Sequence, residues 1–98
     1  MPFEIEFTPE AIEDVRLLPK KERRIVLKGI EAQLRHRPLR ETRNRKRLRP
    51  NQMAEWELRL GKFRVFFDVD PEGLRVKVEA VGYKTGSRLF IHGEEYEL

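Results

Sequence analysis

The basic segment from Arg35 to Pro50, RHRPLRETRNRKRLRP, is the part of the chain whose residue types point most directly to a chemistry. It holds seven arginines and one lysine against a single glutamate. The whole chain has 21 basic and 17 acidic residues, so the rest carries 13 basic against 16 acidic residues, a net charge of −3. A positive field confined to one segment is typical of a surface that binds a polyanion. We therefore predict polyanion binding here, the alternative being a solvated arginine-rich loop without a partner.

The composition excludes several other kinds of site. The chain has no cysteine, which rules out disulfides and thiolate metal sites, and its two histidines, His36 and His92, cannot form a zinc site by themselves. We expect neither a metal nor another cofactor. No apolar run is long enough for a membrane span or a secretory signal, so we expect a cytoplasmic protein. A length of 98 residues predicts a single domain, residues 1–98.

The first part of the sequence predicts a strand followed by two helices. FEIEF, residues 3–7, alternates apolar and acidic residues, as a half-buried strand does. Thr8, Pro9 and Glu10 then suit the start of a helix that ends near Pro19. A second helix runs from there and ends before Pro38. The apolar faces of the two helices are predicted to hold Ala11, Val15 and Leu18 in the first, and Val26, Leu27, Ile30 and Leu34 in the second.

The second part of the sequence changes to a period of two and predicts a meander of three antiparallel strands. Gly61-Lys62 is a tight turn between the first two strands, and Asp70-Pro71-Glu72-Gly73 resembles a type I turn followed by a left-handed residue. The residues predicted to face the core are Trp56, Leu58 and Leu60, then Phe63, Val65, Phe67 and Val69, then Val76, Val78 and Ala80. The opposite face is predicted to hold Glu55, Glu57 and Arg59, then Arg64, Phe66 and Asp68.

The C-terminal RLFIHGEEYEL is either a short hairpin that turns at His92-Gly93 or a frayed helix, and its β-branched and aromatic residues favour the hairpin. The complete pattern predicts a two-layer α+β domain: an N-terminal strand, a helical hairpin, a three-stranded antiparallel meander and a short C-terminal extension. The helices should cover one face of the sheet. The basic segment should then lie at the edge of the domain, beside the exposed face.

Two stretches, EWELRLGKFRVFFDVD (residues 55–70) and VEAVGYK (residues 78–84), together with the helical hairpin before them, resemble the RelE/ParE toxins of type II toxin-antitoxin systems. LRLGKFRVFFDV is the most specific part, similar to the family's leucine-arginine-x-glycine-x-tyrosine-arginine-valine hairpin. The resemblance implies a RelE-like fold and a toxin that forms a hetero-oligomer with a cognate antitoxin wrapped around it. Many members cut messenger RNA in the ribosomal A site, whereas ParE-like members act on DNA gyrase.

Cleavage of RNA without metal requires a base, an acid and cationic stabilisation of the extra phosphoryl charge. The resemblance places Arg64 at a catalytic position of the hairpin, Arg59 at a frequently basic position and Lys84 where a catalytic arginine or histidine is found. All three are expected to approach one phosphate, with the Arg64 guanidinium projecting from the open sheet surface. RNA phosphates are expected to contact the basic segment through Arg40, Arg43, Arg45, Lys46, Arg47 and Arg49.

The sequence also departs from the family pattern. Glu55 and Glu57 stand where RNA-cutting relatives carry two lysines, and Phe90 stands where a tyrosine is common. Glu57 is a candidate base, and Tyr83 and His92 are alternative proton-transfer groups. Phe66, on the face away from the core, is the aromatic residue best placed to contact a base.

Two functions therefore stay open. One is a ribosome-dependent endoribonuclease, or mRNA interferase, whose partners are the ribosome, messenger RNA and an antitoxin. The other is a non-catalytic or gyrase-directed toxin, or a toxin-derived module, whose same face binds a protein. The basic segment favours the first function and the two glutamates favour the second.

Overall fold

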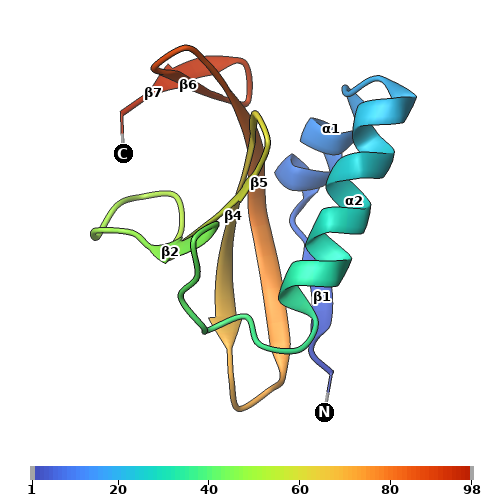
Figure 1. Ribbon diagram of the computed structural model, residues 1–98, viewed down its shortest axis with the longest axis vertical. Coiled ribbons are helices and arrows are strands. Elements are labelled where there is room, and N and C mark those ends of the chain that lie inside the picture. The colour runs from blue at the N-terminus through green and yellow to red at the C-terminus, as the bar shows by residue number, and fades with distance from the viewer. Residues whose placement is uncertain (1, 98) are drawn as a thin grey trace.

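The computed structural model describes residues 2–97, which form two helices and a seven-stranded sheet (Figure 1). The sheet order is β2-β3-β4-β5-β6-β7, and β1 pairs with β5 in parallel. The elements in chain order are β1 Glu4–Phe7, α1 Pro9–Arg16, α2 Lys20–Leu34, β2 Arg45–Arg47, β3 Trp56–Leu60, β4 Phe63–Asp70, β5 Arg75–Thr85, β6 Arg88–Ile91 and β7 Glu94–Tyr96.

The local signals for the two helices are confirmed. The Thr8 hydroxyl accepts a hydrogen bond of 3.1 Å from the Ala11 amide and caps α1, and Pro9 takes the first helical position. The buried face of α2 consists of Val26, Ile30 and Leu34, four residues apart. The prediction for Leu27 is wrong: it lies beside this stripe and is 40% exposed. Within residues 2–97 no helix is both long and apolar enough to cross a membrane.

Both helices cover the same face of the sheet (Figure 1). The main core between the two layers consists of Ala11, Val15, Val26, Ile30, Leu34, Trp56, Leu58, Phe63, Val65, Phe67, Val76, Val78 and Val81. The β3-β4-β5 meander and its Gly61-Lys62 turn are confirmed, with Gly61 at φ 58°. In the next turn the left-handed residue is Leu74, at φ 53°, one position later than predicted. This architecture confirms the two-layer RelE-like α+β prediction.

A β-bulge on β5 changes which side chains face the core. Phe66 pairs with Ala80 and Phe67 pairs with Val78, so Glu79 is an extra residue between them. The bulge reverses the alternation after it. Ala80 therefore faces away from the helices, contrary to the prediction, and Val81 occupies the main core in its place.

The face of the sheet away from the helices, here called the open face, carries a second apolar cluster. The C-terminal hairpin of β6 and β7 curls over this face (Figure 1). Its turn lies at His92 (φ 55°) and Gly93 (φ 79°), so the predicted hairpin is confirmed. The cluster consists of Ala54, Phe66, Ala80, Leu89 and Ile91, with Leu48, Met53 and Tyr96 packed against it. Strand β2, which was not predicted, extends the sheet next to β3 with part of the basic segment.

Candidate phosphate-binding cleft

Side chains from four strands converge on the open face around a cleft of about 210 Å³, called the cationic cleft. Strand alternation brings Glu57, Arg59 and Arg64 to this face from β3 and β4, and Lys84 joins them from β5. The three cations that the family resemblance singled out therefore share one cleft. Its full lining is Arg43, Asn44, Arg45, Lys46, Glu57, Arg59, Arg64 and Lys84.

Arg64 is held firmly rather than projecting into solvent. It is only 8% exposed, and its Nη1 donates hydrogen bonds of 2.7 Å to the Gly61 carbonyl and 2.9 Å to the Phe63 carbonyl. Its Nε lies 3.4 Å from Glu57 Oε1. Burial lowers the pKa of Arg64, the Glu57 carboxylate opposes that shift, and the Arg59 charge adds to it. The expected open projection is therefore wrong, but Arg64 still lines the cleft.

Glu57 is the one carboxylate lining this cleft within residues 2–97. Besides the Arg64 contact, its Oε2 lies 3.8 Å from Lys46 Nζ, and its side chain is 13% exposed. Lys46 reaches it because β2 pairs with β3 in antiparallel register, with Lys46 opposite Glu57. Glu55 makes a similar pair with Arg47 at 3.6 Å. Both glutamates that depart from the family pattern thus pair with a cation of β2.

Some cations of the basic segment contact other groups of the protein, and these are here called engaged. The others are exposed. Arg45 is 6% exposed: it pairs with Leu58 on the helix-covered face, and its Nη1 donates to the Arg37 carbonyl while its Nε has no partner. Burial lowers the pKa of Arg45, and the Arg40 charge lowers it further. Arg47 also lies over the Trp56 ring at 5.7 Å. The burial of Arg45 argues against the predicted RNA contact, whereas Arg40, Arg43 and Arg49 are exposed.

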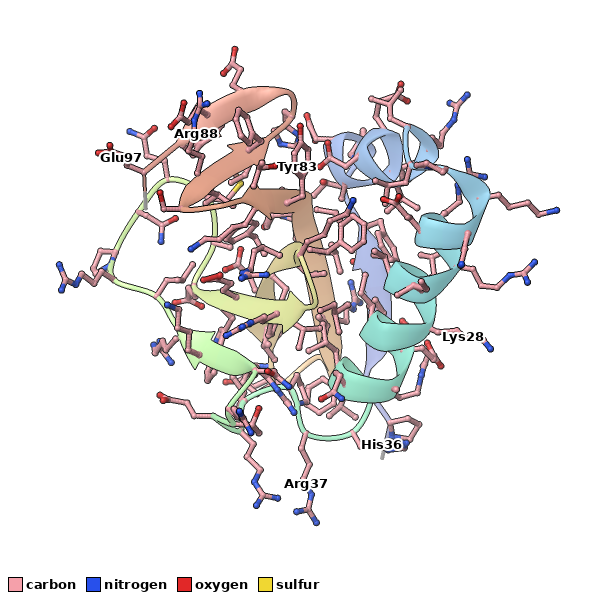
Figure 2. All side chains as sticks on the ribbon, turned by 45° about the horizontal axis from the view of Figure 1, so that its top comes forward. Lys28, His36, Arg37, Tyr83, Arg88 and Glu97 are labelled. Carbon is pink, nitrogen blue, oxygen red and sulfur yellow. The ribbon has the colours of Figure 1, made fainter. Side chains whose placement is uncertain are left out.

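Tyr83 and His92 lie on the other face of the sheet. Tyr83 stacks on Phe90 with ring centroids 5.4 Å apart, beside α1 (Figure 2). His92 Nδ1 lies 2.8 Å from Asp14 Oδ1. Both line a groove of about 480 Å³ together with Leu17. This groove is separate from the cationic cleft. The structure therefore does not bring these proton-transfer candidates together with Arg64.

Phe66 is fully buried in the second cluster, so the predicted base contact is wrong. The C-terminal hairpin covers it, and alternation along β4 alone could not show that cover. Ser87 and Tyr96, which were not predicted as site residues, line a neighbouring cleft of about 280 Å³. This cleft shares Lys46, Glu57 and Lys84 with the cationic cleft. The signal was present in the predicted hairpin, because a turn at His92-Gly93 places Tyr96 opposite Leu89.

Glu79 is a titratable residue on another part of the open face. Burial raises the pKa of Glu79 to about 7, a hydrogen bond and the charge of Asp68 raise it as well, and Lys77 opposes them. The Lys77 Nζ lies 3.6 Å from Glu79 Oε2, and Asp68 Oδ1 accepts a hydrogen bond of 2.8 Å from the Glu55 amide. Glu79 and Asp68 line a hollow of about 590 Å³ that is separate from the cationic cleft. The β-bulge positions Glu79, so a regular strand pattern could not have identified it.

No family model matches the sequence, and no curated protein matches it. The structure is similar to a chain of the solved toxin-antitoxin complex RelBE2 from Mycobacterium tuberculosis. The TM-score is 0.75 and the sequence identity 26%, with 86% of this chain and 93% of that chain covered. This similarity, together with the element order and the LRLGKFRVFFDV hairpin, confirms the predicted resemblance to a RelE-like toxin of a type II toxin-antitoxin system.

Proposed function

We propose that this protein is a toxin that inhibits translation in the cytoplasm by cutting messenger RNA on the ribosome. The observation that carries the proposal is the convergence of Arg59, Arg64 and Lys84 on one cleft, with Arg43 and Lys46 beside them. Not counting the buried Arg45, five cations and a single carboxylate line the cleft, which therefore has a strong excess of positive charge. A phosphate of RNA supplies the opposite charge, and the contacts to it would be charge-assisted hydrogen bonds.

In the proposed reaction the 2′-hydroxyl of a bound nucleotide attacks its own phosphate, and the 5′-oxygen leaves. The phosphate gains negative charge in the transition state. Arg64 is preorganised for that charge because two carbonyls already fix its guanidinium plane, so little rearrangement is needed as the charge develops. Arg59 and Lys84 add positive charge from the adjacent strands. Of the three groups predicted for proton transfer, Glu57 lines the cleft, whereas Tyr83 and His92 line the groove on the other face.

An antitoxin is the proposed protein partner. The similar RelBE2 structure is itself a toxin-antitoxin complex. On the helix-covered side, the groove that contains Tyr83 also contains Leu17, which is 76% exposed. Exposed apolar side chains of this size favour contact with another protein. We therefore expect the protein to act alone as a toxin and to be neutralised in a hetero-oligomer.

The test is cleavage of a defined messenger on programmed ribosomes by the purified chain, read by primer extension. We expect cuts that depend on the ribosome. Ribosomes alone and messenger alone are the controls. Absence of any cut, with growth arrest on expression, would instead favour the non-catalytic or gyrase-directed alternative, which the pairing of Glu57 and Glu55 with Lys46 and Arg47 of the basic segment supports.

A further inference from the structure

Glu57 occupies the position in the cationic cleft where an anionic ligand would be expected. Its two carboxylate oxygens face different cations, Oε1 toward Arg64 and Oε2 toward Lys46. Besides the buried Arg45, three more cations, Arg43, Arg59 and Lys84, line the same cleft. Within residues 2–97, Glu57 is the one carboxylate of the lining. A carboxylate and a phosphate share this geometry, since both present neighbouring anionic oxygens to planar or ammonium donors.

The contacts of Glu57 are long for such a position. Its distances of 3.4 Å and 3.8 Å exceed the roughly 2.7–2.9 Å of a charge-assisted hydrogen bond. The hydrogen bonds of Arg64 to the Gly61 and Phe63 carbonyls, at 2.7 Å and 2.9 Å, are much closer. The backbone therefore orients Arg64, and Glu57 mainly neutralises it. A ligand that approaches the same cations more closely can replace Glu57 without disturbing the arginine.

The structure also contains a place for a displaced carboxylate. Glu57 lines both the cationic cleft and the neighbouring cleft of about 280 Å³. Besides Glu57, the polar residues that line this second cleft are Lys46, Lys84, Ser87, Tyr96 and Glu97. A rotation of the Glu57 side chain toward it would keep the carboxylate near Lys46 and Lys84 while freeing the space beside Arg64.

We propose that Glu57 is a resident anion, and that a phosphate group binds the cleft by displacing this carboxylate from Arg64. The inference rests on the proposed function only for its natural ligand, an RNA phosphate. It assigns to Glu57 the role of a competitor for the phosphate position, in contrast to the predicted role of a general base. Replacing the carboxylate by a neutral group of the same shape then strengthens phosphate binding.

The experiment measures inorganic pyrophosphate binding by calorimetry at low salt for the unmodified chain, Glu57→Gln and Glu55→Gln. Glu55→Gln is the matched control, because Glu55 also pairs with a basic residue of β2 but does not line the cationic cleft. We expect about five- to tenfold tighter binding for Glu57→Gln, on the scale of one partly buried ion pair, and little change for Glu55→Gln. Unchanged or weaker binding for Glu57→Gln would overturn the proposal.

A second measurement uses the unmodified chain and so does not depend on how a variant folds. In a pyrophosphate titration followed by NMR, the Arg64 Nε–H and the Glu57 carboxylate carbon should shift together with the same midpoint. A Glu57 signal that stays in place while Arg64 responds would overturn displacement.

Ribosome assays separate this proposal from the proposed function. If the unmodified chain does not cut but Glu57→Gln binds pyrophosphate more tightly, the role of Glu57 as a resident anion is supported and the proposed RNA cleavage is rejected. If the unmodified chain cuts, and Glu57→Gln loses cleavage without gaining affinity for pyrophosphate, Glu57 acts as the base and its role as a resident anion is rejected.

Discussion

The two faces of the sheet bury neighbouring residues of the same strand for different purposes. Phe66 and Phe67 are adjacent on β4 and are both fully buried. Phe67 belongs to the main core under the two helices, whereas Phe66 belongs to the smaller cluster under the C-terminal hairpin. The first face is closed by the two helices, which cover an apolar core cluster. The second is closed only in part, and the cationic cleft lies in the remainder, so this face combines a small core with a binding surface.

Substitution of the main core should have the largest effect. Phe67→Ala should lower the free energy of unfolding by about 3–5 kcal/mol, because it removes a fully buried aromatic ring from the larger cluster. Phe66→Ala removes the same ring from the smaller cluster. We expect a loss near 3 kcal/mol, together with faster amide exchange in β6 and β7, because the hairpin packs on this ring.

Urea unfolding and native-state hydrogen exchange check this pair of variants. Unchanged exchange in β6 and β7 after Phe66→Ala would mean that the hairpin does not depend on the open-face cluster. The two faces would then form a single cooperative core.

The exposed cations of the basic segment should account for most of its RNA binding. Replacing Arg40, Arg43 and Arg49 with alanine should flatten the slope of log affinity against log salt by up to about three. The engaged cations should contribute less, because Arg47 already contacts Glu55 and Trp56. Salt titration with one short RNA measures both effects. A larger change for Arg47→Ala alone than for the triple variant would contradict this division.

Glu79 should make stability depend on pH. Its pKa of about 7 in the folded chain lies above the usual glutamate value, so the folded state holds this proton more tightly than the unfolded state. The stabilisation is complete below about pH 4.5 and is lost as the pH rises toward and through about 7. Glu79→Gln should remove this decline, so its stability relative to the unmodified chain should rise by roughly 2–3 kcal/mol between pH 5 and pH 8.

The control for Glu79 is Glu6→Gln, an exposed carboxylate on β1. Thermal unfolding of the three proteins between pH 5 and pH 8 gives the comparison. If Glu79→Gln and the unmodified chain follow parallel curves over this range, the raised pKa does not contribute to folding stability.

Local sequence patterns could predict the helix-covered face but only part of the open face. The cap at Thr8 and the Gly61-Lys62 turn depend on neighbouring residues, and the period of two along β4 follows from strand geometry, so all three were predictable. Ala80 was predicted on the wrong face because a bulge arises from the pairing of two strands and cannot be recognised in the sequence of either strand alone. Phe66 was misjudged because the hairpin that covers it comes from far along the chain.

The cationic cleft shows the same limit. The resemblance identified Arg59, Arg64 and Lys84, and their convergence follows from the predicted meander. Strand β2 was not predicted, because the dense run of charges does not show the alternation of a strand. This strand determines the burial of Arg64 and Arg45 and the pairing of Lys46 with Glu57. A run of arginines reports its total charge, but only the fold shows which of them are free.

The central claim is that the cationic cleft stabilises the transition state of RNA cleavage through Arg64. The most direct measurement is the single-turnover rate of messenger cleavage on programmed ribosomes for the unmodified chain, Arg64→Ala, Arg64→Lys and Arg75→Ala. Arg75 is the matched control, because this arginine of β5 is exposed and pairs with Glu6 at 3.7 Å outside the cleft.

We predict a loss of roughly 100-fold or more for Arg64→Ala, and a large loss for Arg64→Lys, since an ammonium group cannot reproduce the guanidinium fork. Arg64→Ala should also lower the free energy of unfolding by about 1–3 kcal/mol, through its two lost carbonyl contacts. The rates are therefore compared at a temperature where all four proteins are folded. Cleavage by Arg64→Ala at the rate of Arg75→Ala would contradict the claim.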